Sequence, residues 1–201
     1  MRSGDINWQK TEEDMDRDGF VRLPNLLDAG QCRRVINGFE EDRRYRRHIV
    51  MQRHGYGQGE YKYFDYPLPE LVAELREEFY APLADIANRW AEKLATGQRF
   101  PETLGEYTAQ CHAAGQVKPT PLILKYGEGD YNRLHQDLYG ELLFPLQMAI
   151  LMSEPGQDFD GGEFILTEQR PRQQSRARVV PLSKGDAVIF AVNQRPVPGK
   201  N

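Results

Sequence analysis

The sequence YGEGDYNRLHQD, residues 126–137, is the stretch on which the fold assignment depends. It contains a histidine and an aspartate, His135 and Asp137, separated by one residue. On an extended strand, residues i and i+2 point to the same side, so both side chains can reach one metal ion. An imidazole and a carboxylate suit Fe(II), and one further protein ligand would leave positions open for an oxo-acid and dioxygen. The pair therefore predicts part of an iron site.

The segments around this pair favour a β-rich core, which matters because a His-X-Asp tripeptide alone also occurs by chance. Short apolar or alternating runs separated by Gly, Pro and Asp predict strands joined by turns, as in a sandwich or barrel. Gly161-Gly162 predicts a tight turn with positive φ, and Gly185-Asp186 predicts the turn that enters a late strand. The predicted strands are 122–124, 146–151, 163–166, 178–180 and 187–190.

The first part of the chain has helical periodicity instead. Residues 11–18 predict a short acidic helix that Gly19 ends, and the alternation over 20–23 predicts a strand. Asp28 is a candidate N-cap for a following helix. That helix places an apolar stripe toward the core, formed by Cys32, Val35, Ile36 and Phe39.

A second helical region begins near Pro69, and Pro82 is expected to break it. Its apolar positions recur at helical spacing and are interpreted as core rather than as cofactor contacts. We therefore expect a single domain over 1–201, in which 1–120 is mainly helical support and 121–201 a partial β core. The apolar positions are Leu71, Val72, Leu75, Phe79, Leu83, Ile86, Trp90 and Leu94.

Composition sets the outer limits of these interpretations. A chain of 201 residues with 39% hydrophobic and 10% aromatic residues can bury a substantial core. The net charge of -4 argues against a globally basic nucleic-acid binder. Cys32 and Cys111 lack the spacing of a disulfide framework or a thiolate zinc site. No apolar run approaches the roughly 18 residues of a membrane span, so we expect a cytoplasmic protein without a membrane partner.

Together these motifs resemble the Fe(II)- and 2-oxoglutarate-dependent dioxygenase superfamily, in particular a bacterial group described as proline-hydroxylase-like or DNA-repair-like. The resemblance rests on LHQDLYGE at 134–141, FPLQMAILMSEPG at 144–156, FDGGEFILTEQRPR at 159–172 and KGDAVIFAV at 184–192. DGFVRLPNLLD at 18–28 also fits. The resemblance implies an α+β fold, with a double-stranded β-helix (jelly-roll, cupin-like) core and N-terminal helices packed on it.

The same resemblance implies roles for three residues. His135 and Asp137 correspond to two Fe(II) ligands, and Tyr126 corresponds to a tyrosine that contacts the co-substrate 2-oxoglutarate. An alternative for Tyr126 is a strand-end tyrosine that caps the core, because amphipathic tyrosines often lie at such edges. Dioxygen and 2-oxoglutarate are the expected partners of the reaction.

One part of the family pattern is missing from these 201 residues. The family's distal His and its 2-oxoglutarate-binding Arg should follow the last predicted strand, but neither position exists here. The four histidines, His48, His54, His112 and His135, lie at or before the motif. We therefore expect the chain to be a truncated form that lacks its last core strands. Such a chain should bind metal weakly or be catalytically inactive.

The substrate is less well defined by the sequence. Hydroxylation of a protein or amino-acid side chain is the leading prediction, oxidative demethylation of damaged nucleic acid is the alternative, and a noncatalytic cupin-like binding module is a third. Two arginine-rich stretches, over 43–48 and 170–178, can contact an anionic substrate. Their simpler interpretations are the solvated end of a helix followed by a Gly-rich lid, and an exposed loop.

Overall fold

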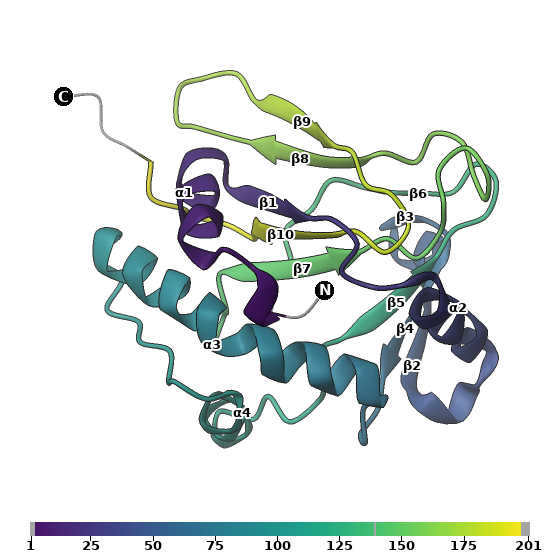
Figure 1. Ribbon diagram of the computed structural model, residues 1–201, viewed down its shortest axis with the longest axis horizontal. Helices are drawn as coiled ribbons and strands as arrows, with labels where there is room; N and C mark the ends of the chain where they lie inside the picture. The colour runs from purple at the N-terminus through teal and green to yellow at the C-terminus, as the bar shows by residue number, and fades with distance from the viewer. Residues whose placement is uncertain (1–2, 139, 198–201) are drawn as a thin grey trace.

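The computed structural model describes residues 3–138 and 140–197, whose helices and strands are drawn in Figure 1. The predicted mixture of helices and strands is confirmed, and each ladder between named strands is antiparallel. The α-helices are α1 (Trp8–Asp18), α2 (Ala29–Asn37), α3 (Glu70–Lys93) and α4 (Leu104–Ala113). The strands are β1 (Phe20–Leu23), β2 (Tyr45–Val50), β3 (Gly57–Gln58), β4 (Glu60–Phe64), β5 (Leu122–Lys125), β6 (Tyr131–Asn132), β7 (Leu146–Ile150), β8 (Phe164–Glu168), β9 (Arg176–Val180) and β10 (Ala187–Ala191).

A three-stranded sheet in the order β1-β10-β7 forms the centre of the molecule. Leu23 of β1 pairs with Ala187 of β10, which pairs on its other side with Ile150 of β7. Ala187, Val188 and Ile189 have no exposed surface. Because β10 is covered on both faces, its sequence is a continuous apolar run rather than an alternating one. The predicted first and last strands are confirmed.

Helix α3 runs along this sheet and supplies more of the apolar side chains that cover it than any other helix (Figure 1). Ile86 and Trp90 are essentially inaccessible to solvent. Burial of such a side chain contributes about 1.5–3 kcal/mol. The indole Nε1 of Trp90 also donates to Asp16 Oδ1 at 2.7 Å, and this hydrogen bond links α3 to α1. Neither α3 nor any other helix within the described ranges is long and apolar enough to cross a membrane.

The break predicted at Pro82 is wrong, because α3 continues through it. A proline inside a helix removes one backbone hydrogen bond and costs about 3 kcal/mol. Phe79 and Leu83 on either side are buried in the core, and their burial offsets that cost. The predicted start is confirmed, since Pro69 is the N-cap.

The two N-terminal helices are delimited by the signals that the sequence predicts. Gly19 ends α1 in the left-handed conformation, with φ 78°. Asp28 and Gln31 form a reciprocal capping box at the start of α2. The predicted inward position of Ile36 is wrong, since this residue is 40% exposed. The helix is short and lies at the edge of the molecule (Figure 1), so only a narrow stripe around Cys32 is covered.

A second sheet, in the order β2-β4-β5, was not predicted in full. Residues 43–48, expected to end a helix, instead lead into and form most of β2. The reason is that β2 and β4 lack regular apolar alternation and are held by ring and cation contacts. The rings of Tyr45 and Phe64 lie 5.0 Å apart, and the buried Lys62 donates to the Phe39 carbonyl at 2.9 Å.

The sheets join the two parts of the chain that the sequence separates near residue 120. In the second sheet, β4 from the first part pairs with β5 from the last part. In the central sheet, β1 pairs with β10. Each of these two sheets therefore contains strands from both parts, and the strands after residue 120 begin and end close to their predicted positions.

The turn at Gly185 and Asp186 ties the central sheet to the segment before α2. Gly185 has φ 85°, and a Cβ there would lie 2.1 Å from the Leu27 carbonyl oxygen. Asp186 is buried, and its carboxylate accepts from the backbone N–H groups of Asn25 and Ser183 at 2.8 and 2.9 Å. The structural role predicted for this turn is confirmed. Gly161 and Gly162 also have the predicted positive φ, 72° and 65°.

Candidate metal site

The segment that carries His135 and Asp137 starts from a short anchored strand. β6 pairs with β3, and the N–H of Arg133 donates to the Tyr56 carbonyl at 2.9 Å. The pairing requires Gly57, because a Cβ there would lie 2.1 Å from the Tyr131 carbonyl oxygen. The prediction of an extended strand through the motif is wrong, since residues 133–138 are irregular. The reason is that β3 is only two residues long, so its pairing with β6 ends at Asn132.

The irregular backbone nevertheless brings the two predicted ligands together. His135 Nε2 lies 3.4 Å from Asp137 Oδ1. Two neighbouring ligands of an octahedral ion, each about 2.1 Å from it, are about 3.0 Å apart. The observed separation is close to that spacing. Both side chains are partly exposed, at 47% and 33%, so an ion and a co-substrate can approach from solvent.

The remaining polar atoms of both side chains are held by other groups. His135 Nδ1 lies 2.7 Å from the Arg133 carbonyl oxygen, which can only accept, so Nδ1 carries the hydrogen. The lone pair of Nε2 in the neutral ring then faces the Asp137 carboxylate and is free to bind a metal ion. Asp137 Oδ2 accepts from Gln147 Nε2 at 3.1 Å. Metal-binding histidines and carboxylates usually have such supporting hydrogen bonds.

The structure places Tyr126 directly after β5, with its ring beside Gly59. Its hydroxyl interacts with the Asn132 side chain, and burial of that end raises the pKa of Tyr126 although the residue as a whole is 44% exposed. Tyr126 follows the end of β5, and it belongs to neither hydrophobic core cluster among the described residues. The role of Tyr126 in binding 2-oxoglutarate stays a prediction.

The other histidines lie in different surroundings. His48 pairs with Glu60, the ring of His54 stacks on Tyr56 at 5.4 Å, and His112 lies in the last turn of α4. Within residues 3–138 and 140–197, no group of three His, Cys, Asp or Glu side chains is arranged to hold a metal ion. Among the described residues, His135 and Asp137 could therefore supply only part of a metal ion's ligand set. Tyr139, within the motif stretch 134–141, and residues 198–201 lie outside the described residues.

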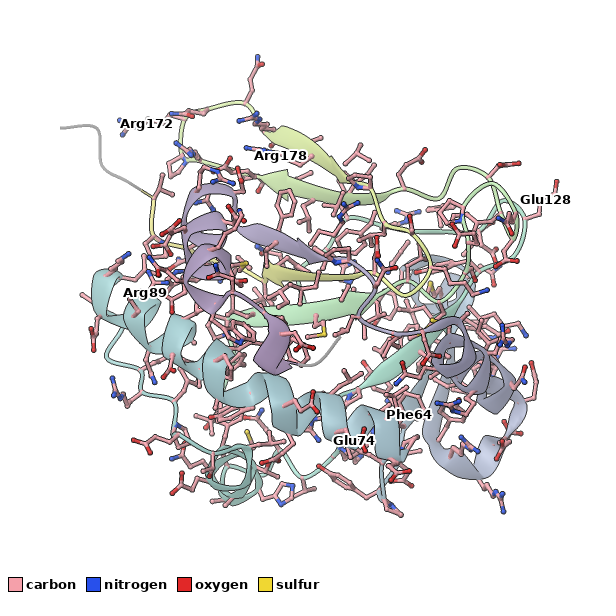
Figure 2. All side chains as sticks on the ribbon, in the orientation of Figure 1. Phe64, Glu74, Arg89, Glu128, Arg172 and Arg178 are labelled. Atoms are coloured by element: carbon pink, nitrogen blue, oxygen red, sulfur yellow. The ribbon has the colours of Figure 1, made fainter. Side chains whose placement is uncertain are left out.

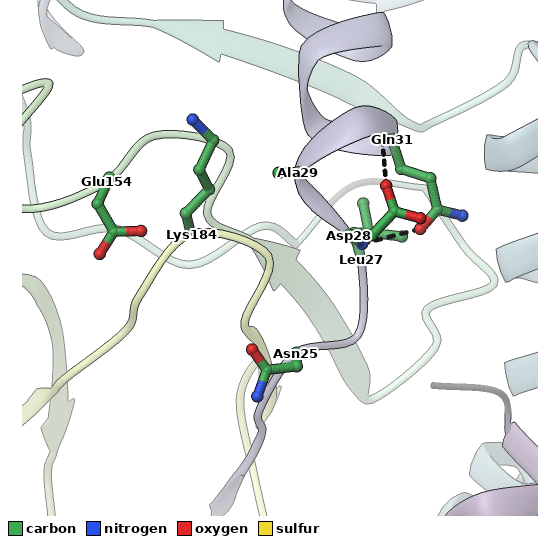
Figure 3. Close-up of a pocket in the computed structure, with 7 residues that line it drawn as sticks. All are labelled: Asn25, Leu27, Asp28, Ala29, Gln31, Glu154 and Lys184. Carbon is green, nitrogen blue, oxygen red and sulfur yellow. Dashed lines mark hydrogen bonds between the residues drawn. The ribbon is translucent and has the colours of Figure 1, made fainter.

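A cavity of about 390 Å³ lies elsewhere, at the N-terminal end of α2 (Figure 3). Its polar side chains are already engaged in part. Asp28 and Gln31 form the capping box drawn as dashed lines, and Lys184 lies 3.5 Å from Asp158. The cavity does not include either predicted metal ligand. It is lined by Asn25, Leu27, Asp28, Ala29, Gln31, Glu154 and Lys184.

Sequence reasoning missed two residues that support the site. Gln147 stands in an otherwise apolar strand, LQMAI, and this isolated amide is the signal that could have identified it. Asn193, after β10, accepts from the Gln136 amide at 3.4 Å. No local pattern in the sequence predicts that contact, because the two residues are far apart along the chain. The central sheet thus supports the motif from both β7 and the segment after β10.

Comparison with known proteins defines the class of this chain. Residues 59–201 match the family described as "Oxygenase, catalysing oxidative methylation of damaged DNA". The match covers well over half of the chain and includes the whole motif stretch. The chain belongs to this oxygenase family. The predicted family resemblance is confirmed.

Individual proteins and one solved structure are also similar to this chain. Two uncharacterized proteins, from two strains of Mycobacterium tuberculosis, are each 48% identical over 134 residues. The aligned region is 67% of this chain, and the chain spans 58% of the length of these relatives. The crystal structure of a Pseudomonas putida prolyl-4-hydroxylase is similar with a TM-score of 0.50 and 13% identity, covering 92% of this chain and 86% of that one. At this identity the likeness concerns the fold alone.

Proposed function

We propose that the chain is the core of an Fe(II)- and 2-oxoglutarate-dependent oxygenase, with His135 and Asp137 as two of the iron ligands. The observation that carries the proposal is the approach of His135 Nε2 to Asp137 Oδ1, 3.4 Å apart. Supporting hydrogen bonds leave these two atoms available to one ion. The antiparallel sheets and the likeness to a prolyl-4-hydroxylase fold support a double-stranded β-helix as the underlying architecture.

Each residue of the pair has a distinct task in this proposal. The Arg133 carbonyl fixes the tautomer of His135 so that Nε2 can bind the metal. Gln147 orients Asp137 and leaves Oδ1 directed toward the imidazole. Bound iron, with dioxygen and 2-oxoglutarate, supplies the oxidation of a C–H bond. In the overall reaction 2-oxoglutarate becomes succinate and carbon dioxide, and one oxygen atom enters the substrate.

The substrate class that these observations favour is a methylated DNA base. The family description names damaged DNA. Large side chains beside the motif are also exposed: Tyr56 by 47%, Tyr131 by 47% and Leu134 by 68%. Exposed aromatic side chains stack on unpaired bases. Oxidation of an N-methyl group gives a hydroxymethyl group, which leaves as formaldehyde and restores the base.

Hydroxylation of a protein or amino-acid side chain was the leading prediction from the sequence. No particular contact favours it, because the likeness to a prolyl-4-hydroxylase carries the fold and not the substrate. It therefore becomes the competing outcome of the experiment below. A noncatalytic cupin-like binding module is the other competing outcome.

The experiment measures succinate and formaldehyde after incubation with Fe(II), 2-oxoglutarate and either an N-methylated oligodeoxynucleotide or a proline-containing peptide. It uses residues 1–201 and, in parallel, any longer product of the same gene. The proposal expects formaldehyde release with the methylated DNA, lost in His135→Ala and retained in His112→Ala.

Succinate formation that is stimulated by the peptide, without formaldehyde, would instead identify a protein side chain as the substrate. Absence of 2-oxoglutarate turnover by every form of the protein would favour the binding module. The expected inactivity of residues 1–201 stays a prediction that the arm with these residues tests.

A further inference from the structure

The β8–β9 hairpin carries an unusual excess of positive charge. Between residues 169 and 185 the sequence contains five basic residues and no aspartate or glutamate, whereas the chain as a whole has a net charge of -4. The stretch includes the loop between the strands, all of β9 and the approach to β10. Figure 2 shows Arg172 and Arg178 at the edge of the molecule that lies away from α3. The basic residues are Arg170, Arg172, Arg176, Arg178 and Lys184.

Nearby carboxylates neutralise only part of this charge, and Lys184 is paired with Asp158 at 3.5 Å. Glu168 is already shared, because its Oε1 lies 2.8 Å from both Arg170 and Arg195. Asp18 likewise pairs with Arg17 at 2.6 Å as well as with Arg178 at 3.3 Å. Among the described residues, neither Arg172 nor Arg176 forms an ion pair, and both are exposed. These two cations are therefore available to an external anion.

The backbone at the hairpin tip is strained in a way that presents one of these arginines. Gln173 N–H donates to the Arg170 carbonyl at 3.1 Å and closes a four-residue turn with Pro171 at its second position. Arg172 occupies the third position with φ 62°. A turn of this kind favours glycine or asparagine there, and another residue costs about 1–2 kcal/mol. A strained residue at an exposed tip points to a function for its side chain.

The base of the hairpin contacts the same structure that supports the candidate metal ligands. Phe164 of β8 packs against Phe190 of β10, with ring centroids 5.4 Å apart. Phe190 pairs in the sheet with Gln147, whose amide holds Asp137. Nucleic acid bound along the hairpin would thus contact an element that packs against the sheet supporting Asp137.

We propose that the tip of the β8–β9 hairpin, through Arg172 and Arg176, binds the phosphate backbone of the DNA substrate. Guanidinium groups suit phosphate because they donate two parallel hydrogen bonds to it. The choice of DNA rests on the proposed function, whereas the availability of the two arginines does not. Binding can be measured without iron or 2-oxoglutarate, so failure of this surface and failure of the oxygenase assignment give different results.

The test is fluorescence anisotropy of a labelled single-stranded oligodeoxynucleotide over about 50 to about 200 mM salt. The variant Arg172→Gly/Arg176→Ala removes both cations and relieves the turn. The matched control, Arg33→Ala/Arg34→Ala, removes two exposed arginines from α2. We expect the hairpin variant to bind about tenfold more weakly, with the slope of log affinity against log salt smaller by about 1.4. The control should bind like the wild type, and the hairpin variant should melt no lower than the wild type.

Three results would overturn the proposal. The first is wild-type protein that does not bind the oligonucleotide. The second is an equal loss in the control and hairpin variants, which would indicate a diffuse charge effect. The third is displacement of DNA by polyglutamate at equal charge concentration, which would indicate an acidic protein partner. Intact, hairpin-dependent DNA binding together with no 2-oxoglutarate turnover would leave this surface in place and reject the oxygenase assignment alone.

Discussion

Gln147 on β7 donates its side-chain amide to Asp137 Oδ2 at 3.1 Å and so connects the central sheet to the candidate metal site. This contact joins a regular strand to an irregular segment. Without it, the Asp137 side chain would be free to rotate away from His135. The proposed iron pair therefore depends on a residue outside the His-X-Asp motif.

Replacement of Gln147 should weaken metal binding without unfolding the protein. We expect Gln147→Leu to lower the Mn(II) affinity by about tenfold, because supporting hydrogen bonds to metal ligands typically contribute 10–100-fold. The measurement is isothermal titration calorimetry, with Met148→Leu in the same strand as the control. Equal affinities for wild type and Gln147→Leu would show that Asp137 needs no such support.

The turn that enters β10 should tolerate no side chain at its glycine. Gly185→Ala places a Cβ 2.1 Å from the Leu27 carbonyl oxygen and should cost roughly 3 kcal/mol of unfolding free energy. Gly115→Ala is the matched control, since Gly115 also has positive φ, 81°, but nothing lies within 4 Å of its added Cβ. It should cost about 1 kcal/mol. Similar losses in urea unfolding of the two variants would contradict the close packing at Leu27.

Alkaline pH should destabilise the contact between Tyr80 of α3 and the neighbouring ring of Tyr107. Burial raises the pKa of Tyr80 to about 12, and its hydroxyl donates to the Pro101 carbonyl at 2.9 Å. The folded pKa lies above the unfolded value of about 10, so the contribution of Tyr80 is complete below pH 10 and is lost as pH rises toward 12. Burial raises the pKa of Tyr107 in the same direction.

Urea unfolding at pH 9 and pH 11 tests this linkage. The wild type should lose roughly 1 kcal/mol more than Tyr80→Phe between the two pH values, because phenylalanine cannot ionise. Tyr66→Phe, which removes an exposed hydroxyl, is the control and should behave like the wild type. A pH dependence that is the same in all three proteins would exclude Tyr80 as its source.

The sequence was most informative where local chemistry decides the structure. Gly19, Asp28 and the Gly185-Asp186 turn were identified correctly because caps and turns depend on neighbouring residues. The late strands were found because each is a short apolar run between turn residues. The path of the chain at Pro82 could not be predicted, since burial of distant side chains against α3 outweighs the local cost of proline.

The proximity of the two predicted ligands could be expected from the sequence, but the backbone geometry that produces it could not. His135 and Asp137 lie close together as expected, yet through an irregular segment rather than the strand that motivated the expectation. The position of that segment depends on Gly57 and on Gln147, which are remote in sequence. The strand β2 was also missed, because its partner β4 and the buried Lys62 stabilise a segment that is rich in arginine.

The most direct test of the central claim is Mn(II) binding to residues 1–201, followed by the loss of the electron paramagnetic resonance signal of the free ion. Wild type, His135→Ala, Asp137→Ala and His112→Ala are compared, with circular dichroism to confirm folding. If His135 and Asp137 are two ligands of one ion, each of their variants should bind at least about tenfold more weakly, while His112→Ala binds like the wild type. Unchanged affinity in folded His135→Ala and Asp137→Ala would contradict the assignment.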